Sequence, residues 1–329
     1  MKIGITGGAG FIGTRLAERL LEADSLRLGG AAPAALDELV LADLAAPHAS
    51  VAGDSRVRPV VGSLAETLDE LRDVDAVFHL AGVVSSAAEA DFDLGLDTNI
   101  DATRALLELY RGNGRAPLFV FSSSLAVFGS DPAIGPIGEV DDDTLPRPQS
   151  SYGVEKFIAE QYVAEYTRRR FVRGRNVRLM TVSVRPGRPN AAASSFLSGL
   201  IREPLAGERA ACPVPPDTEV ALSSPTKTVQ GLLRAVEVSD GEWGSRTAMN
   251  LPALTTTPAE MVAALARVAG TEVAALVDWT HDDAIAAIVT SWPARFRPAR
   301  ATALGLEPET SFDDIIRAYL GGAGHSASS

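Results

Sequence analysis

The order of apolar and polar positions along the chain predicts strands that alternate with helices. Short, almost continuously apolar runs fit buried strands of a parallel sheet, whereas apolar residues that recur every three or four positions fit amphipathic helices. Strands are expected over residues 2–6, 38–42, 57–61, 76–80, 118–121 and 177–184. Helices are expected over residues 11–23, 98–110, 151–170, 195–202, 227–236 and 258–269. This alternation predicts right-handed crossovers and an α/β fold with a Rossmann-type, doubly wound parallel sheet.

The regular alternation ends after Gly187, where a segment rich in Pro, Ser and Ala runs over residues 188–230. We expect a dinucleotide-binding Rossmann domain over residues 1–187 and leave open whether later segments return to it. Residues 188–320 should form mainly a smaller α/β substrate domain that covers the carboxyl edge of the sheet. The small and polar residues 321–329 are expected to be a disordered tail.

The charge balance limits the possible partners of the chain. Its 329 residues include 30 Lys and Arg against 42 Asp and Glu, which gives a formal net charge of −12. This excess of negative charge argues against nucleic acid and against anionic membrane surfaces as partners. An anionic small-molecule substrate would have to be bound by local arginines that work against the overall field.

Cysteine and histidine usage gives no support for disulfides or metal sites. Cys212 is the only cysteine, so no disulfide can form within the chain, and we expect it to be a small apolar filler rather than a nucleophile. The four histidines are dispersed at positions 48, 79, 281 and 325, so no metal is expected. An apolar stretch of about 18 residues and an apolar leader are both missing, so a cytoplasmic protein is expected.

A glycine-rich turn joins the first expected strand to the first expected helix. It reads Thr6-Gly7-Gly8-Ala9-Gly10-Phe11-Ile12-Gly13. Gly7 allows a tight turn, Gly10 lets the backbone approach a pyrophosphate, and Gly13 lets the helix pack on the strand. A purely structural turn could carry the same glycines. Their place between a strand and a helix, at the start of a βαβ series, favours dinucleotide binding.

Asp43 ends the second expected strand and is the candidate for the adenosine end of that dinucleotide. A carboxylate at this position accepts hydrogen bonds from the ribose hydroxyls and repels a 2′-phosphate. Neither Arg nor Lys follows it over residues 44–47, so NAD is favoured over NADP. The alternative is that Asp43 only caps a loop, since its spacing from Gly13 is longer than the usual ~20 residues.

Tyr152 and Lys156 are the candidate catalytic pair. They stand four positions apart at the start of an expected helix, and therefore on one helix face. An unperturbed tyrosine has a pKa of ~10, and a neighbouring ammonium is expected to lower that pKa and favour the phenolate. Ser122, Ser123 and Ser124 end the fifth strand at the carboxyl edge, where open α/β sheets bind ligands. Ser124 could hydrogen-bond a substrate hydroxyl or carbonyl.

With these residues in this order, the chain resembles the extended short-chain dehydrogenase/reductases, the NAD-dependent epimerase/dehydratase family. The matching segments are 6–13, 79–82, Asn99, 121–129, Tyr152 with Lys156, and 185–187. The resemblance implies bound NAD, a catalytic Ser124, Tyr152 and Lys156, an Asn99 that supports the lysine, and a homodimer. It also implies cofactor contacts from Gly7, Gly10, Phe11, Ile12, Asp43, Ser63, Leu64, Leu80, Ala81, Gly82, Asn99, Ser122, Tyr152, Lys156 and Pro186.

Three positions depart from the family pattern. Leu125-Ala126 stand where dehydratases carry an Asp-Glu pair, so no acid/base pair for elimination is present. Ser63 replaces the usual Asp after the third strand, which weakens the expected adenine contact. Glu219 stands where sugar-nucleotide members place an Arg for the diphosphate, which argues against a nucleotide-sugar substrate.

Segments 184–196, 201–208, 212–218 and 291–293 resemble those of family members that oxidise a small sugar acid at C2. This resemblance implies NAD-dependent oxidation of an aldonate such as D-erythronate to the 2-keto acid. The candidates for the substrate carboxylate are Arg188, Asn190, Ser194 and Ser195, although Arg188 could equally form a surface salt bridge. Ser85 and Ser123 are the candidates for the sugar hydroxyls.

Two other functions remain open at the level of sequence. The first is a nucleotide-sugar epimerase that uses the same hydride step reversibly with tightly bound NAD. The second is a non-catalytic dinucleotide sensor on a Rossmann scaffold, but such a protein would be expected to lose Tyr152 or Lys156, and both are present.

Overall fold

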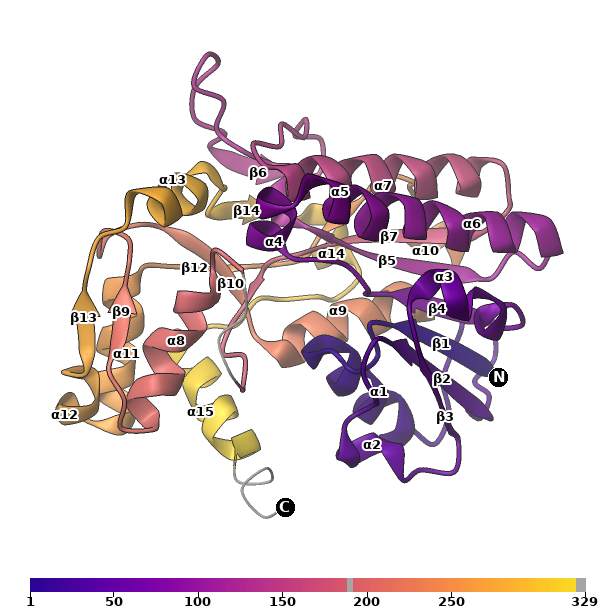
Figure 1. Cartoon of the computed structure of the whole chain (residues 1–329), viewed down its shortest axis with the longest axis horizontal. Coiled ribbons are helices and arrows are strands. Elements are labelled where there is room, and N and C mark those ends of the chain that lie inside the picture. Colours follow the sequence, from indigo (N-terminus) through magenta and orange to yellow (C-terminus); the bar gives the residue numbers. More distant parts are fainter. Residues whose placement is uncertain (188–191, 324–329) are drawn as a thin grey trace.

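The computed structural model describes residues 1–187 and 192–323 of the chain (Figure 1). Its centre is a parallel sheet of seven strands in the order β3-β2-β1-β4-β5-β7-β11. The strands are β1 (Lys2–Thr6), β2 (Glu38–Asp43), β3 (Val57–Val61), β4 (Ala76–His79), β5 (Leu118–Ser124), β7 (Arg173–Leu179) and β11 (Met249–Asn250). This is the strand order of a Rossmann fold, so the predicted fold class is confirmed.

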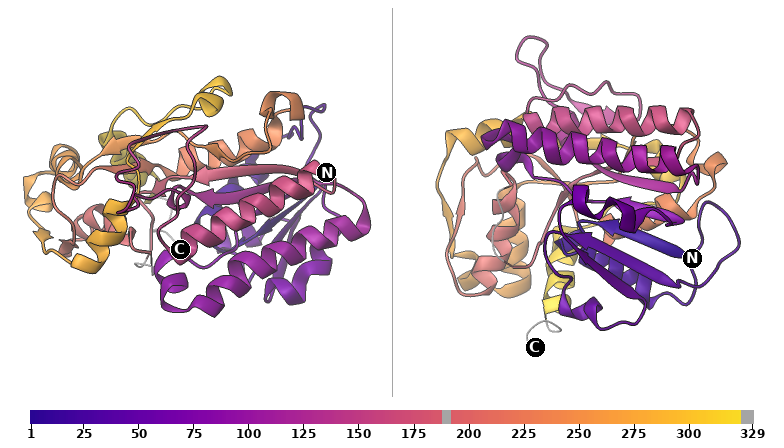
Figure 2. Two further views of the ribbon diagram at one scale, coloured as in Figure 1. Left: turned by 90° about the horizontal axis from the view of Figure 1, so that it is seen from above. Right: turned by 45° about the vertical axis from the view of Figure 1, so that its right-hand side comes forward.

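Helices cover both faces of this sheet, because its strands are apolar on both sides (Figures 1 and 2). On one face lie α6 (Ala102–Asn113) and α7 (Ser151–Arg168), which share a core with β4 and β5. On the other face lie α1 (Phe11–Glu22) and α9 (Pro225–Glu237). Shorter elements complete this half: α2 (Ala49–Ala52), α3 (Leu64–Thr67), η1 (Leu68–Leu71), α4 (Ser85–Ala90), α5 (Phe92–Gly95), η3 (Leu125–Val127) and α10 (Asp240–Trp243).

A second lobe stands beside the sheet (Figure 2). Its helices are α8 (Ser195–Leu205), α11 (Pro258–Ala269), α12 (Thr271–Ala274), α13 (Asp283–Ser291) and α15 (Phe312–Ala323), whereas α14 (Ala299–Ala303) packs in the core of the central sheet. Its strands are β8 (Thr181–Val182), β9 (Ala210–Cys212), β10 (Val220–Ser223), β12 (Leu254–Thr256) and β13 (Val277–Trp279). The lobe has its own apolar core, in which Cys212 is buried at 1% exposure, as expected of an apolar filler.

Two chain segments return from the second half to the first. Strand β11 pairs in parallel with β7 at the edge of the central sheet, and α9 packs on the face that also carries α1. In addition, β14 (Arg295–Arg297) pairs with β6 (Glu139–Asp141), which lies in the long connection between β5 and α7. The carboxylate of Asp141 accepts a hydrogen bond from Thr144 and pairs with Arg297.

Three expected elements differ in detail from the structure. The helix expected over 98–110 begins as a π-helical segment, η2 (Leu96–Asp101), before α6. The strand expected over 177–184 is two strands in different sheets, β7 and β8. The first residues of β7 were not predicted to be part of a strand. Arg173, Arg175 and Asn176 interrupt the apolar run there, and they bind polar partners elsewhere in the chain. Residues 321–323, expected to be disordered, form the end of α15, and 324–329 lie outside the described residues.

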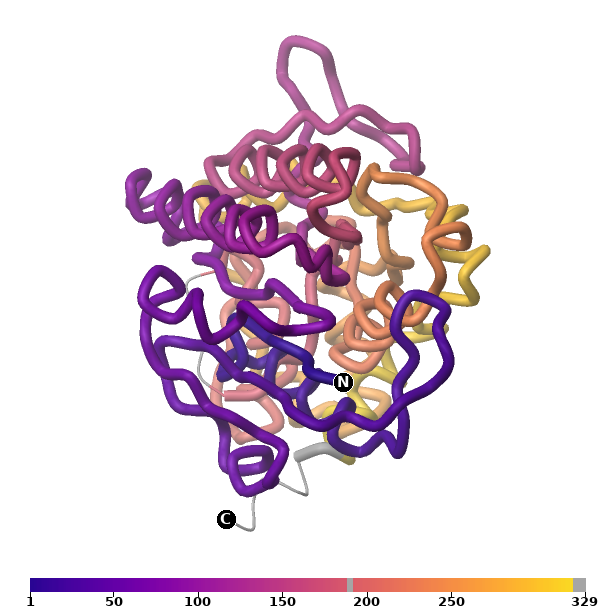
Figure 3. Tube along the Cα trace, turned by 90° about the vertical axis from the view of Figure 1, so that its right-hand side faces the viewer, coloured from indigo at the N-terminus to yellow at the C-terminus, as the bar shows by residue number. Residues whose placement is uncertain are grey.

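The loop between α1 and β2 is long because it reaches across the molecule (Figure 3). The backbone N–H of Gly29 donates to the carbonyl of Val236, and that of Gly30 donates to Glu237, both at 2.8 Å. The loop therefore ties the start of the chain to the end of α9.

Within the part of the chain that the structure covers, we find no helix long and apolar enough to cross a membrane. The same residues hold no group of three or more His, Cys, Asp or Glu that could bind a metal.

Candidate functional site

The turn between β1 and α1 has the backbone geometry that a bound pyrophosphate requires. Gly7 has φ +73°, and a Cβ there would lie 2.8 Å from the amide nitrogen of Ala81. A Cβ at Gly13 would lie 2.1 Å from the carbonyl oxygen of Gly7. Gly10 is the N-cap of α1 and offers no capping side chain, so the first N–H groups of the helix stay available. These residues fit a dinucleotide whose phosphates lie at the N-terminus of α1.

Asp43 lies beside this turn, at the end of β2. Its carboxylate accepts a hydrogen bond from the N–H of Ala9 at 3.0 Å and one from Ala45 at 3.2 Å. The residue therefore does cap a loop, and it does so next to the phosphate cradle, where the ribose of a dinucleotide would lie. The hydroxyl of Ser63 donates instead to Glu66 in a capping box at the start of α3. Cofactor contacts of Asp43, Ser63 and Leu64 remain predictions.

The turn opens into a cavity of about 310 Å³ at the carboxyl edge of the sheet. Side chains from both halves of the molecule line it. The lining residues from the first half include Gly7, Gly10, Phe11, Ile12, Leu80, Gly82, Ser85, Ser122, Ser123, Ser124, Tyr152, Lys156 and Arg185. The second half contributes Ala192, Ser194 and Trp292. The predicted glycine turn, the predicted catalytic residues and three further predicted substrate residues, Ser85, Ser123 and Ser194, therefore meet at one cavity.

Ser124, Tyr152 and Lys156 lie on one wall of this cavity. Ser124 ends β5, and Tyr152 stands in the first turn of α7, whose N-cap Ser150 accepts the N–H of Gly153 at 3.2 Å. The Nζ atom of Lys156 lies 5.6 Å from the centre of the Tyr152 ring. It donates a hydrogen bond to the carbonyl oxygen of Ser122 at 3.0 Å, which fixes the ammonium beneath the tyrosine.

The pKa of Tyr152 moves in the direction opposite to the one expected from the sequence. Burial raises this pKa to about 12, while the hydrogen bond with Ser124 and the positive charge of Arg185 lower it. Burial also lowers the pKa of Lys156 to about 8, against the raising effect of Glu155 and Glu160. The expected lowering of the tyrosine pKa is therefore wrong for the chain by itself, because desolvation outweighs the nearby positive charges.

Asn99 is held rigidly next to Lys156. Its side-chain oxygen accepts the N–H of Val83 at 3.1 Å, and its amide nitrogen donates to Val83 and to Glu155, the latter at 2.6 Å. A Cβ at Gly82 would lie 2.6 Å from the Asn99 oxygen and 3.3 Å from the Lys156 Nζ, so both groups flank the same glycine. This position agrees with the supporting role predicted for Asn99.

Ser123, which was predicted to contact a sugar hydroxyl, takes part in an internal hydrogen-bond network. Its hydroxyl donates to the carboxylate of Glu160, and the residue is only 2% exposed. Glu160 in turn forms a buried ion pair with Arg178 on β7 at 2.7 Å. Because side chains alternate along a strand, Ser123 faces this pair while Ser122 and Ser124 point elsewhere. Its hydroxyl donates into the internal network, and the sugar contact predicted for Ser123, which also lines the cavity, remains a prediction.

The remaining predicted residues are spread around the cavity. Ser195 begins α8, directly after Ser194. Pro186 is exposed and lines a larger adjoining cavity of about 1040 Å³. Arg188 and Asn190 lie outside the described residues, so their predicted contacts with a carboxylate are not addressed by the structure.

Arg185 and Trp292 are among the lining residues that were not predicted as site residues. Both belong to segments that resemble those of known family members, but a sequence does not tell which side chains of a matching segment turn inward. Glu219, which replaces the expected diphosphate arginine, is paired with Arg295 at 2.6 Å. Glu219 therefore offers no positive charge to a diphosphate, and its carboxylate offsets the charge of the nearby Arg295.

The strand order, the glycine cradle and the wall formed by Ser124, Tyr152 and Lys156 place the chain among the dinucleotide-dependent oxidoreductases of the short-chain type. Comparison with known proteins agrees with this class. The model of the "NAD dependent epimerase/dehydratase family" matches residues 3–221. The chain therefore belongs to this family, which confirms the predicted family, the predicted cofactor NAD and the oxidoreductase class.

Three relatives show how far the similarity extends. A D-erythronate dehydrogenase from Cupriavidus necator is 50% identical over 98% of this chain and 99% of its own length. A D-erythronate dehydrogenase from Haemophilus influenzae is 41% identical over 97% of this chain and 99% of its own length. The crystal structure of a nucleoside-diphosphate-sugar epimerase from Agrobacterium tumefaciens is 36% identical, with a TM-score of 0.86, and covers 98% of this chain and 94% of that one.

Proposed function

We propose that the protein oxidises the C2 hydroxyl of a small sugar acid, D-erythronate in the first instance, to the 2-oxo acid with NAD. The observation that carries this proposal is the meeting of Ser124, Tyr152 and Lys156 on one wall of a cavity next to the glycine cradle. The two full-length relatives named for D-erythronate support the choice of substrate.

The chemistry of the proposed reaction divides among the three residues. Tyr152, as phenolate, accepts the proton of the C2 hydroxyl, and Ser124 holds that hydroxyl by hydrogen bonding. The ammonium of Lys156 favours the phenolate through its positive charge. NAD, when it is bound, supplies the acceptor for the hydride from C2. The glycine turn with Phe11 and Ile12 would hold its pyrophosphate, and Asp43 its adenosine ribose.

A nucleotide-sugar epimerase is the second candidate, because a 36% identical structure carries that name. An epimerase keeps its NAD and returns the hydride to the same sugar, so NADH does not accumulate. The pairing of Glu219 with Arg295 counts against a diphosphate site at that place. The uncharged Leu125 and Ala126, which line the cavity next to Ser124, leave no acid for elimination and so count against a dehydratase, not against an epimerase.

The test is a panel of four- to six-carbon aldonates with NAD, followed by the absorbance of NADH. D-erythronate is expected to give one equivalent of NADH for each equivalent of 2-oxo acid formed. A parallel panel of UDP- and GDP-sugars is expected to give neither NADH nor an epimeric sugar. Turnover of a sugar nucleotide, with all aldonates inert, would show that the proposal is wrong.

A further inference from the structure

Arg185 lines the catalytic cavity with a guanidinium that meets no acceptor within the described residues. The contacts of Arg185 are made by its backbone: its N–H donates to the hydroxyl of Ser198 at 3.0 Å, and its carbonyl oxygen accepts from Arg202 at 2.9 Å. The side chain is only partly exposed and lines the catalytic cavity. A desolvated cation without an anionic partner is costly, so an interior seldom keeps one without a use for it.

The charged residues that line the cavity indicate whether its ligand carries a positive or a negative charge. Among the described residues that line it, Lys156 and Arg185 carry charge, and none is Asp or Glu. This is unusual in a chain that has 42 acidic residues and a net charge of −12. Lys156 is already bound to the carbonyl of Ser122, which leaves the guanidinium of Arg185 as the open cation. An anionic ligand would supply the partner that this guanidinium lacks among the described residues.

The position of Arg185 relative to Tyr152 narrows the choice of anion. Arg185 and Tyr152 line the same cavity, and the positive charge of Arg185 acts to lower the pKa of the phenol. In a 2-hydroxy acid, the carboxylate carbon is bonded directly to the carbon that bears the reacting hydroxyl. A cation that holds this carboxylate must therefore lie beside the group that removes the hydroxyl proton. A terminal phosphate on a four-carbon chain would instead need a cation several bonds away.

We infer that Arg185 binds the carboxylate of the substrate and thereby presents C2, rather than C3 or C4, to Tyr152. The inference rests on the proposed function, which it deepens by assigning the carboxylate subsite to this residue. The guanidinium can form two parallel hydrogen bonds to the carboxylate, which fixes the orientation of the substrate as well as its affinity. The hydroxyl of Ser194, which also lines the cavity, is a neighbouring donor.

The test compares a carboxylate substrate with its neutral amide in three variants. D-erythronate and D-erythronamide share the C2 hydroxyl and differ in charge. Arg185→Met keeps the length of the stem and removes the charge, so kcat/KM for the acid should fall about 10²-fold while that for the amide changes less than about threefold. Arg185→Lys keeps the charge and loses the two-pronged geometry, so an intermediate loss is expected. Arg295→Met, which removes a paired arginine outside the cavity, should leave the ratio of acid to amide unchanged.

The outcomes separate this inference from the proposed function. If the wild-type protein oxidises the acid and Arg185→Met keeps the wild-type ratio of acid to amide, the assignment of Arg185 is overturned and the function stands. If the wild-type protein oxidises no aldonate, the proposed function fails, and the subsite is tested by thermal protection with D-erythronate, which needs no turnover. Protection that Arg185→Met abolishes would support the subsite. Protection that survives in Arg185→Met, or none in the wild type, would overturn it.

Discussion

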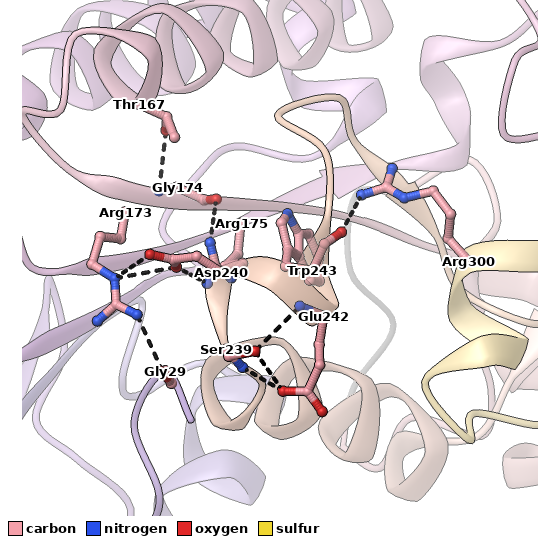
Figure 4. Close-up of polar contacts among 10 residues, drawn as sticks. All are labelled: Gly29, Thr167, Arg173, Gly174, Arg175, Ser239, Asp240, Glu242, Trp243 and Arg300. Carbon is pink, nitrogen blue, oxygen red and sulfur yellow. Dashed lines mark hydrogen bonds and ion pairs between the residues drawn. The ribbon is translucent and has the colours of Figure 1, made fainter. Parts of the chain in front are cut away.

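At the amino ends of the strands, a cluster of arginines is fully occupied with partners from the chain itself (Figure 4). The guanidinium of Arg173 donates to Asp240 at 3.0 Å and to the carbonyl of Gly29 at 3.3 Å. Arg175 pairs with the same carboxylate and lies 5.3 Å from the ring of Trp243. Arg300 lies near that ring, at 5.5 Å, and donates to the carbonyl of Trp243. At the carboxyl edge, Arg185 has no such acceptor among the described residues.

The difference between these two regions separates structural from functional polar groups. At the amino end, one Asp240 joins β7 to α10, and Arg173 extends the link to the loop that carries Gly29, so the arginines hold segments together. At the carboxyl edge, Tyr152 and Arg185 line a cavity, and we propose that their functional partner is the substrate. Because buried polar groups are nearly always paired, a cavity-lining cation without an internal partner is a candidate for ligand binding.

The largest effect is expected from the group that takes part in the chemistry. Tyr152→Phe removes one hydroxyl and keeps the ring, so kcat should fall about 10²–10⁴-fold. The midpoint of thermal unfolding should stay within about 2 °C of the wild-type value, since no internal partner except Ser124 is lost. Steady-state kinetics and circular dichroism measure the two quantities on the same samples. A near-normal kcat would show that Tyr152 is not the base.

At the amino ends of the strands, we expect a substitution to lower stability and to leave activity nearly unchanged. Arg175→Met breaks a pair in which the arginine is only 2% exposed, so the free energy of unfolding should fall by about 2 kcal/mol. This figure is below that of a fully buried pair because Asp240 is 58% exposed and keeps Arg173. Activity per folded molecule should stay within about twofold. Urea unfolding would measure the loss, with Arg185→Met as the matched variant that should not be destabilised.

If Arg175→Met lowered kcat/KM while Arg185→Met lowered stability, the division between the two regions would be refuted. Equal stability losses in both variants would show that Arg185 has a structural partner.

Sequence alone predicted the parts of the molecule that depend on local patterns. The apolar runs of β1 to β5 and the spacing of Gly7, Gly10 and Gly13 follow from strand burial and from turn geometry. Tyr152 and Lys156 share a helix face because of helical periodicity. These features need no knowledge of distant segments, and the structure places them at one cavity.

The features that sequence reasoning missed depend on partners far away in the chain. The start of β7 is buried because Asp240 pairs with Arg173 and Arg175, which interrupt the apolar run of the strand. The tyrosine pKa depends on how much protein surrounds Tyr152, and a sequence gives no measure of desolvation. Arg185 belongs to a segment that resembles known family members, but its lack of an acceptor among the described residues becomes visible only in the structure.

His79 shows that structural polar groups also occur at the carboxyl edge of the sheet, close to the candidate catalytic residues. It lies near Lys156, but its ring nitrogens are satisfied by Thr6 at 2.6 Å and Thr103 at 2.8 Å, so it belongs with the structural groups. The hydroxyl of Thr103 donates to the carbonyl of Asn99, which indicates that His79 carries its proton on Nε2. Burial, helped by the charge of Lys156, lowers the pKa of His79 from 6.5 to about 3.

This pKa shift predicts how stability depends on pH. Between pH 6.5 and about 3, the unfolded chain protonates His79 and the folded protein does not, so stability falls as the pH falls. The slope from this one group should be about 1.4 kcal/mol for each pH unit below about 6. Urea unfolding at pH 6.0 and 5.0 would measure it, with His79→Gln as the comparison. A slope that His79→Gln does not reduce would contradict the assignment.

Asp43 lies between the two kinds of group, and the smallest effect is expected there. Its carboxylate is used internally by the N–H groups of Ala9 and Ala45, yet it stands next to the glycine cradle. Asp43→Asn removes the negative charge and keeps one acceptor oxygen, so the repulsion of a 2′-phosphate disappears while the loop loses one hydrogen bond. We expect the ratio of kcat/KM for NADP to that for NAD to rise about tenfold, with a loss of stability below about 1 kcal/mol. Glu38→Gln, which removes one negative charge at the opposite end of β2, should leave the cofactor ratio unchanged. If Asp43→Asn lowered stability but left the ratio unchanged, Asp43 would belong with Arg175 as a purely structural group.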